Sequence, residues 1–308
     1  MHEVVRELME RDWPPAVVAR VPLDGGALVA GFEPAGRQRL RWVAKVGYGQ
    51  AACQRLRAEA AALRGLAAVA EQLQIPRLLA YREQGGGATA RACLAQSGLA
   101  GARWRRRRAA AVLAWLRRFQ ELAPGPGPRP ALQTLVATMR EQCTTQVRCD
   151  PDLAPWLDWV AAQLPPESHA GAALAAPVHG DFWPGNVLWQ PGGGVGVVDW
   201  GGWGWGSRLD DVLTWHTHPG LGEARLDPVL RQGEARRCLR AWAAAAGYDG
   251  AAARLAFYLF VARRVRWELG LDLQARRQAE RRQARREWRA VLAALARQRY
   301  PDPFAARA

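Results

Sequence analysis

The 308-residue sequence has a single lysine, few cysteines and no long apolar segment. Because no run of about 18 apolar residues occurs, we expect no membrane-spanning helix. The start of the chain is acidic, with Glu3, Glu7, Glu10 and Asp12, and does not resemble a signal peptide, so we expect a cytoplasmic protein. The five cysteines are scattered and form no CxxC pair, which argues for reduced thiols and against a zinc site or disulfide framework.

The scarcity of lysine makes Lys45 a candidate functional residue. It is the only lysine among 43 basic residues, and the net charge is +15. This charge is compatible with a nucleic-acid or acidic-lipid partner, but the wealth of arginine, alanine and glycine favours GC-rich coding as its origin. A compact ammonium on a flexible stem is needed only where guanidinium does not fit. The alternative is that one lysine survives by chance.

The first hundred residues predict a small β-rich unit with one helix. Turn signals and β-type composition predict five strands, at residues 17–21, 27–32, 40–46, 75–81 and 90–95. Apolar residues at helical spacing predict a helix over residues 51–68.

Helices dominate the rest of the chain. They are predicted at residues 104–122, 131–142, 153–164, 226–246, 251–271 and 274–299, and a strand-and-loop island interrupts them at 177–211. The Gly-containing segment 96–101 is typical of an interdomain hinge. We therefore expect an N-terminal domain of residues 1–97 and a C-terminal domain of residues 98–308.

The island holds residues suited to phosphoryl transfer. This chemistry needs a carboxylate that orients the attacking hydroxyl and accepts its proton, and oxygen ligands that hold Mg²⁺ against a triphosphate. Asp181 is followed five residues later by Asn186, and Asp199 follows a short apolar strand predicted at 195–198. Asp181 can face the nucleophile, while Asn186 and Asp199 can hold the metal from two sides.

The same residues resemble the motifs of a known family. His179-Gly180-Asp181 with Asn186, followed by Val198-Asp199-Trp200, is similar to the H-G-D-x-x-x-x-N and Ile/Val-Asp-Trp/Phe motifs of the aminoglycoside phosphotransferase and choline kinase-like family, relatives of the protein kinases. The resemblance implies an α+β, protein-kinase-like bilobal fold, with a small antiparallel β-sheet lobe with one helix and a mainly α-helical large lobe. It further implies ATP- and Mg²⁺-dependent transfer of the γ-phosphoryl group to a small-molecule hydroxyl.

Roles for individual residues follow from the resemblance. It implies Asp181 as catalytic base and Asn186 and Asp199 as magnesium ligands. His179 is similar to the residue that braces the loop, and Asp211 to the residue that ties the loop down from a following helix. Ser207 and Arg208 stand where the family usually has Asp-Pro.

The N-terminal unit is similar to the nucleotide-binding lobe of such kinases. Lys45 lies in a Val-Ala-Lys strand and resembles the lysine that holds the α- and β-phosphates, and Glu59 resembles the helix glutamate that pairs with it. Gly25 and Gly26 are the candidates for a phosphate-covering loop, with a plain hairpin turn as the alternative. Adenine is expected against the segment containing Gln96.

Other functions remain open from the sequence. The run at 105–108 and the arginines at 277, 281, 285 and 289 allow a basic nucleic-acid-binding protein, although a solvated helix face is favoured. A protein kinase is disfavoured by missing activation-segment signals, and a non-catalytic kinase-like protein is a further alternative. Within the family, the acceptor could be an amino alcohol, an amino sugar, a sugar or a related metabolite. Acceptor, oligomeric state and preference for ATP over GTP are not determined by the sequence.

Overall fold

The structure is a computed structural model that describes residues 17–23, 26–32, 40–99, 101–103, 109–130, 134, 175–217, 233–257 and 259–260. The chain forms two compact units. Unit 1 comprises residues 1–127 and 179–204, and unit 2 comprises residues 128–178 and 205–308. The expected domain boundary between residues 97 and 98 stays a prediction.

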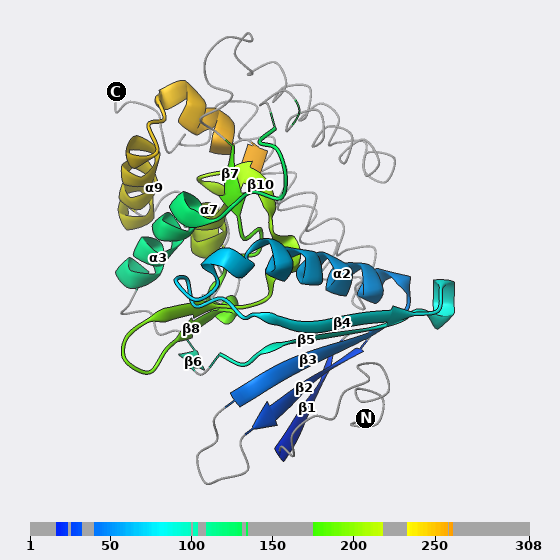
Figure 1. The fold of residues 1–308 in the computed structure, drawn as a ribbon. Coiled ribbons are helices and arrows are strands. Elements are labelled where there is room, and N and C mark those ends of the chain that lie inside the picture. Colours follow the sequence, from blue (N-terminus) through cyan, green and yellow to red (C-terminus); the bar gives the residue numbers. More distant parts are fainter. Residues whose placement is uncertain are drawn as a thin grey trace, which may run out of the picture. The chain divides into compact units, whose positions relative to one another are not determined.

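Unit 1 contains a five-stranded antiparallel sheet with strand order β1-β2-β3-β5-β4 (Figure 1). The strands are β1 (Val17–Leu23), β2 (Gly26–Phe32), β3 (Leu40–Tyr48), β4 (Leu78–Gln84) and β5 (Arg91–Ser97). All five strands were predicted from the sequence. β4 begins three residues later than predicted, because the Ile75 amide bonds to the Ala70 carbonyl in a turn and Pro76 has no N–H to donate.

Helix α2 (Gln50–Gly65) lies along one face of this sheet (Figure 1). Its alanines, leucines and arginines favour helix, and its buried residues include Ala52, Leu56 and Leu63. The helix ends three residues before the predicted end, and the chain continues as the 3₁₀ turn η1 (Ala67–Val69). β3 and α2 pack so closely that a Cβ on Gly47 would lie 3.0 Å from the Cβ of Ala52.

A second part of unit 1 is built on aromatic packing. A three-stranded sheet is formed by β6 (Ala102–Arg103), β8 (Val187–Trp189) and β9 (Val195–Val197). Helix α3 (Ala109–Leu122) contributes Trp115 and Phe119, whose rings stack on each other, with Trp115 also stacked on Phe182. The Trp115 indole N–H donates to the Leu73 carbonyl at 2.8 Å, so this aromatic cluster joins α3 to the chain after η1.

Unit 2 contains a two-stranded sheet, β7 (Ala175–Val178) with β10 (Gly204–Ser207), and the helices α7 (Asp210–Thr217) and α9 (Gly233–Ala245). Ser207 caps the start of α7: its Oγ accepts a hydrogen bond from the Leu209 backbone N–H at 3.0 Å, and the Asp210 carboxylate accepts one from the Ser207 backbone N–H at 3.0 Å. The helices predicted at 131–142, 153–164 and 274–299 lie outside the described residues, apart from residue 134. Within the described parts of the chain, no helix combines the length and apolar character needed to cross a membrane.

Candidate active site

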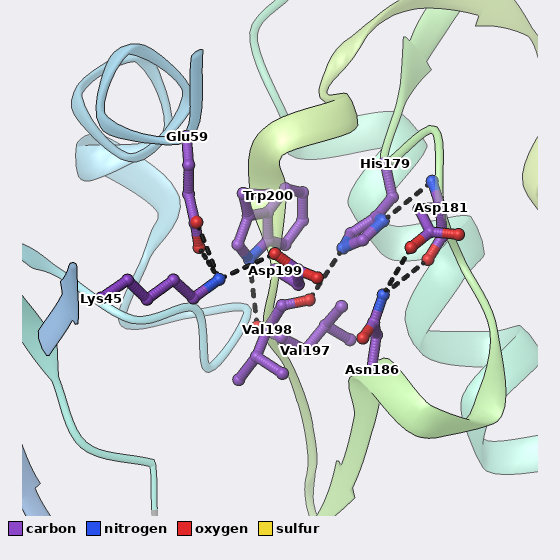
Figure 2. Close-up of polar contacts among 9 residues, drawn as sticks. All are labelled: Lys45, Glu59, His179, Asp181, Asn186, Val197, Val198, Asp199 and Trp200. Carbon is purple, nitrogen blue, oxygen red and sulfur yellow. Dashed lines mark hydrogen bonds and ion pairs between the residues drawn. The ribbon is translucent and has the colours of Figure 1, made fainter. Parts of the chain in front are cut away.

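Lys45 stands at the centre of an ion-pair network in unit 1. Its Nζ atom lies 2.7 Å from each carboxylate oxygen of Glu59 and 2.7 Å from Oδ1 of Asp199 (Figure 2). Lys45 is on β3, Glu59 is on α2, and Asp199 lies two residues after the end of β9. One ammonium therefore joins three segments that are far apart in the sequence.

The surrounding charges keep Lys45 protonated. Burial lowers the pKa of Lys45, but the negative charges of Glu59 and Asp199 outweigh burial and raise its pKa above the ordinary value. Burial likewise raises the pKa of Asp199, and the Lys45 ammonium outweighs it, so the pKa of Asp199 is lowered. The Glu59 side chain is 3% exposed and that of Asp199 is 50% exposed, so Asp199 is the accessible carboxylate of the network.

The β8–β9 hairpin brings Asn186 beside Asp199. Val187, which follows Asn186, pairs with Val197, and the Val198 backbone N–H donates to the Asn186 carbonyl at 3.0 Å. Asp199 itself has φ 69° and ψ 65°, a left-handed conformation that is uncommon outside glycine. Such strain is typical of functional sites, where surrounding contacts hold it in place.

Asn186 turns back toward Asp181. Its side-chain N–H₂ donates to the backbone carbonyl of Asp181 at 2.9 Å and to Oδ2 of Asp181 at 3.1 Å (Figure 2). The nitrogen of the amide is thus committed to Asp181, which leaves the amide oxygen as the group suited to a cation. Asn186 can therefore orient one carboxylate and ligate a metal with opposite ends of the same side chain.

His179 links the loop at 179–186 to the chain before Asp199. Its Nδ1 accepts from the Asp181 backbone N–H at 3.2 Å, and its Nε2 lies 3.1 Å from the Val198 carbonyl, to which it donates. Both bonds require the neutral Nε2–H tautomer. Burial lowers the pKa of His179 to about 4, so the ring is neutral at physiological pH. The Trp200 ring packs against it with centroids 4.5 Å apart.

Two glycines allow the loop to approach the segment after Asp199. Gly180 has φ 83°, and a Cβ on it would overlap the carbonyl oxygen of Gly202. Gly202 is the last residue of the 3₁₀ turn η5 (Trp200–Gly202). The sequence identifies Gly180 only as part of a motif and does not predict its contact with Gly202, because no local signal marks a glycine that is needed for a contact 22 residues away.

The remaining predicted site residues lie in several places. Gln96 is buried on β5, on the Lys45 side of the sheet, and its side-chain oxygen has no hydrogen-bond partner within the part of the chain the structure describes. Gly26 is the first residue of β2, and Gly25 lies outside the described residues. Asp211 is fully buried on α7 of unit 2, and its predicted role in tying the loop down stays a prediction.

The donor set of the loop and hairpin suits Mg²⁺. No group of three or more His, Cys, Asp or Glu side chains in the described ranges is placed to hold a metal ion. Mg²⁺ at nucleotide sites usually has only one or two protein carboxylates or amides and takes its other ligands from phosphates and water. The Asn186 amide oxygen and the half-exposed Asp199 carboxylate fit this pattern.

Comparisons with known proteins identify the family and the fold of the chain. Residues 22–248 match the sequence model of a family described as the phosphotransferase enzyme family. No curated protein matches the chain. The solved structures that it resembles include an aminoglycoside-3'-phosphotransferase of type VIII, at 21% identity and a TM-score of 0.55, over 85% of this chain and 98% of that one.

Two further similar structures contain a nucleotide analogue. One is a thermostable mutant of aminoglycoside phosphotransferase APH(4)-Ia in ternary complex with AMP-PNP and hygromycin B, at 14% identity, a TM-score of 0.62, and coverage of 96% and 99%. The other is the amicoumacin kinase hAmiN in complex with AMP-PNP, Ca²⁺ and Ami, at 12% identity, a TM-score of 0.57, and coverage of 95% and 93%. These likenesses confirm the predicted α+β, protein-kinase-like fold class.

Proposed function

Because this chain belongs to the phosphotransferase enzyme family, we propose that it is an ATP- and Mg²⁺-dependent kinase that phosphorylates a hydroxyl group of a small molecule. The observation that carries the proposal is the convergence of Lys45, Glu59 and Asp199 within 2.7 Å contacts, beside a loop in which Asn186 orients Asp181. The AMP-PNP in two similar structures supports ATP as the phosphoryl donor.

In the proposed mechanism, Asp181 is the catalytic base. Its carboxylate would accept a hydrogen bond from the acceptor hydroxyl, aim the oxygen at the γ-phosphorus and take up the proton. The Asn186 amide keeps one oxygen of this carboxylate in place, and His179 anchors its backbone N–H. The base is thus oriented before substrate binds, which lowers the cost of reaching the transition state.

Lys45 would bind the α- and β-phosphates of ATP. In the structure its ammonium contacts both Glu59 and Asp199, so phosphate binding would replace the Asp199 contact while Glu59 retains the lysine. Asp199 would then be available, with the Asn186 amide oxygen, to hold Mg²⁺. The ion supplies charge neutralisation at the β- and γ-phosphates.

We propose an amino alcohol, an amino sugar, a sugar or a related metabolite as the acceptor. Hygromycin B and Ami, each bound in one of the similar structures, support a small molecule as the acceptor. Gln96, Gly25 and Gly26 are proposed to contact the nucleotide, and Asp211 to support the loop at 179–186. We also propose a cytoplasmic location, because the five scattered cysteines suit a reducing compartment.

A screen of ATP consumption across amino sugars, amino alcohols, sugars and nucleosides tests the proposal. We expect at least one acceptor to accelerate Mg²⁺-dependent ADP release, and Asp181→Asn to lower the turnover number by about 10²- to 10⁴-fold with little change in ATP affinity. Glu121→Gln, on the exposed side of α3, is the matched control and should leave both unchanged. Full turnover in Asp181→Asn would refute the assignment of the base.

A further inference from the structure

The indole of Trp203 lies against the last residue of α2, Gly65. A Cβ on Gly65 would lie 2.5 Å from Cη2 and 2.8 Å from Cζ3 of the Trp203 ring, both far closer than ordinary contacts allow. The φ angle of Gly65 is not positive, so the backbone itself accepts alanine at this position. The residue must be glycine here only because the ring occupies the space of a side chain.

Shape rather than hydrogen bonding holds this ring. The indole Nε1 of Trp203 is buried and has no hydrogen-bond partner within the described residues. A buried donor without a partner costs free energy, so the position of the ring is maintained by the packing around it. A methyl group added at Gly65 would therefore displace the Trp203 ring, because no hydrogen bond from the indole N–H to the described part of the chain holds the ring in place.

One short turn of the chain links Trp203 to Asp199, the carboxylate that contacts Lys45. The Trp203 backbone N–H donates to the Trp200 carbonyl at 3.1 Å and closes η5, which begins immediately after Asp199. Within the same turn, a Cβ on Gly201 would be 4.0 Å from the Cβ of Glu59, so η5 lies against α2 along the helix as well as at its end. A shift of Trp203 would be passed to Asp199 through one short turn.

The opposite side of this segment contacts the loop that carries Asp181. Gly202 precedes Trp203 and abuts Gly180, so closely that neither position has room for a side chain. Gly180 in turn precedes Asp181. The segment at 199–203 is therefore fitted between α2 and the loop at 179–186, and its position affects the residues on both.

We propose that Gly65 and Trp203 form an interlock that positions Asp199 and Asp181 relative to Lys45 and Glu59. Both are positioning residues, and the inference rests on the proposed kinase function, because it assigns them to the same site. The interlock would keep the end of α2 and the segment at 199–203 in one alignment, so that the lysine, the metal ligand and the base face a single triphosphate.

The substitution Gly65→Ala tests the interlock, because its Cβ would displace the Trp203 ring. Overpacking of this kind costs more stability than the higher helix propensity of alanine restores, so we expect a small fall in the melting temperature of a protein that still folds. Displacement of Trp203 should at the same time lower the turnover number. We expect a loss of about tenfold in kcat for Mg²⁺-dependent hydrolysis of ATP with water as acceptor, and a KM for ATP within about twofold of wild type.

A shorter ring should restore the fit. The atoms that a Cβ on Gly65 would meet belong to the six-membered ring of the indole, and phenylalanine at 203 would not reach as far. The double variant Gly65→Ala/Trp203→Phe should therefore be faster than Gly65→Ala alone, which is a non-additive result for two residues in contact. Gly250→Ala is the control, since Gly250 is helical and a Cβ there would meet nothing within 4 Å.

Amide hydrogen exchange gives a readout that does not depend on catalysis. Peptides covering residues 199–204 should exchange faster in Gly65→Ala than in wild type or Gly250→Ala, and should return toward wild type in the double variant. Unchanged exchange, unchanged kcat, or equal effects of Gly65→Ala with tryptophan or phenylalanine at 203 would overturn the interlock. If exchange changes as expected but wild type neither binds nor hydrolyses ATP, the proposed function fails and with it the positioning role, while the contact itself stands.

Discussion

The ammonium of Lys45 is equidistant from the two carboxylate oxygens of Glu59, at 2.7 Å from each. Only 2% of Glu59 is exposed, so the lysine is the counter-charge that allows this carboxylate to remain ionised inside the protein. The pair also fixes α2 against β3. It therefore contributes to the fold of unit 1 as well as to the proposed phosphate site.

Replacing Lys45 with methionine should destabilise the protein through Glu59. We expect the free energy of unfolding at pH 8 to fall by about 1–3 kcal/mol, because a buried acceptor loses its partner. Urea denaturation provides the measurement. Arg77→Met is the control, because the Arg77–Glu71 ion pair has side chains 62% and 83% exposed and should contribute less than about 1 kcal/mol. Equal losses in the two variants would contradict this account of Glu59.

Asn186→Ala should weaken the binding of Mg²⁺ at the active site. The variant removes one proposed oxygen ligand and the amide that orients Asp181, so we expect the Mg²⁺ concentration for half-maximal ATP hydrolysis to rise about tenfold. Rates of ATP hydrolysis measured against the free Mg²⁺ concentration at saturating ATP would show this rise. Chelation of Mg²⁺ by EDTA should abolish the wild-type rate. A variant with an unchanged Mg²⁺ dependence would exclude Asn186 as a ligand.

Stability should decrease on acidification because of His179. The pKa of its ring is about 4 in the folded state, against an ordinary value of about 6.5 when unfolded. Between these values the unfolded chain binds a proton that the folded protein does not, so stability is complete above about pH 6.5 and is lost as the pH falls toward 4. Titration of His179 should lower the free energy of unfolding by about 3 kcal/mol in total.

Urea denaturation of wild type and His179→Gln between pH 7 and pH 4 measures this contribution. The variant should be less stable at pH 7, because the bonds to Asp181 and Val198 are altered, but its stability should depend less steeply on pH. Parallel pH profiles for the two proteins would show that His179 does not titrate as the structure requires.

Gly180→Ala should lower the free energy of unfolding more than Gly192→Ala does. Both glycines have positive φ, at 83° and 94°, so alanine is strained by about 1–2 kcal/mol at each. At Gly192 a Cβ meets nothing within 4 Å, whereas at Gly180 it overlaps the Gly202 carbonyl oxygen. In denaturation experiments, we expect only Gly180→Ala to lose more stability than backbone strain alone explains. We also expect only this variant to reduce ATP turnover. Similar values for both would mean that the approach of Gly180 to Gly202 can relax freely.

Several features of the site were predictable because their signals are local. Strands and α2 follow from periodicity and turn residues that lie within each segment, and the spacing of Asp181 and Asn186 places both in one short loop. Lys45 was identifiable because a chain that uses arginine elsewhere kept one lysine. The prediction for Gly25 is not tested, since that residue lies outside the described parts of the chain.

The sequence by itself determined which groups are available: one ammonium, the carboxylates and amide of the loop and hairpin, and the strands and helix that carry them. Only the tertiary structure decided that Lys45 contacts Asp199, 154 positions away, that the imidazole of His179 joins two backbone segments, and that Trp203 occupies the space a side chain would need at Gly65. Local signals determine secondary structure because they act within a few residues. Contacts between distant segments depend on how whole elements pack, and no short stretch of sequence contains that information.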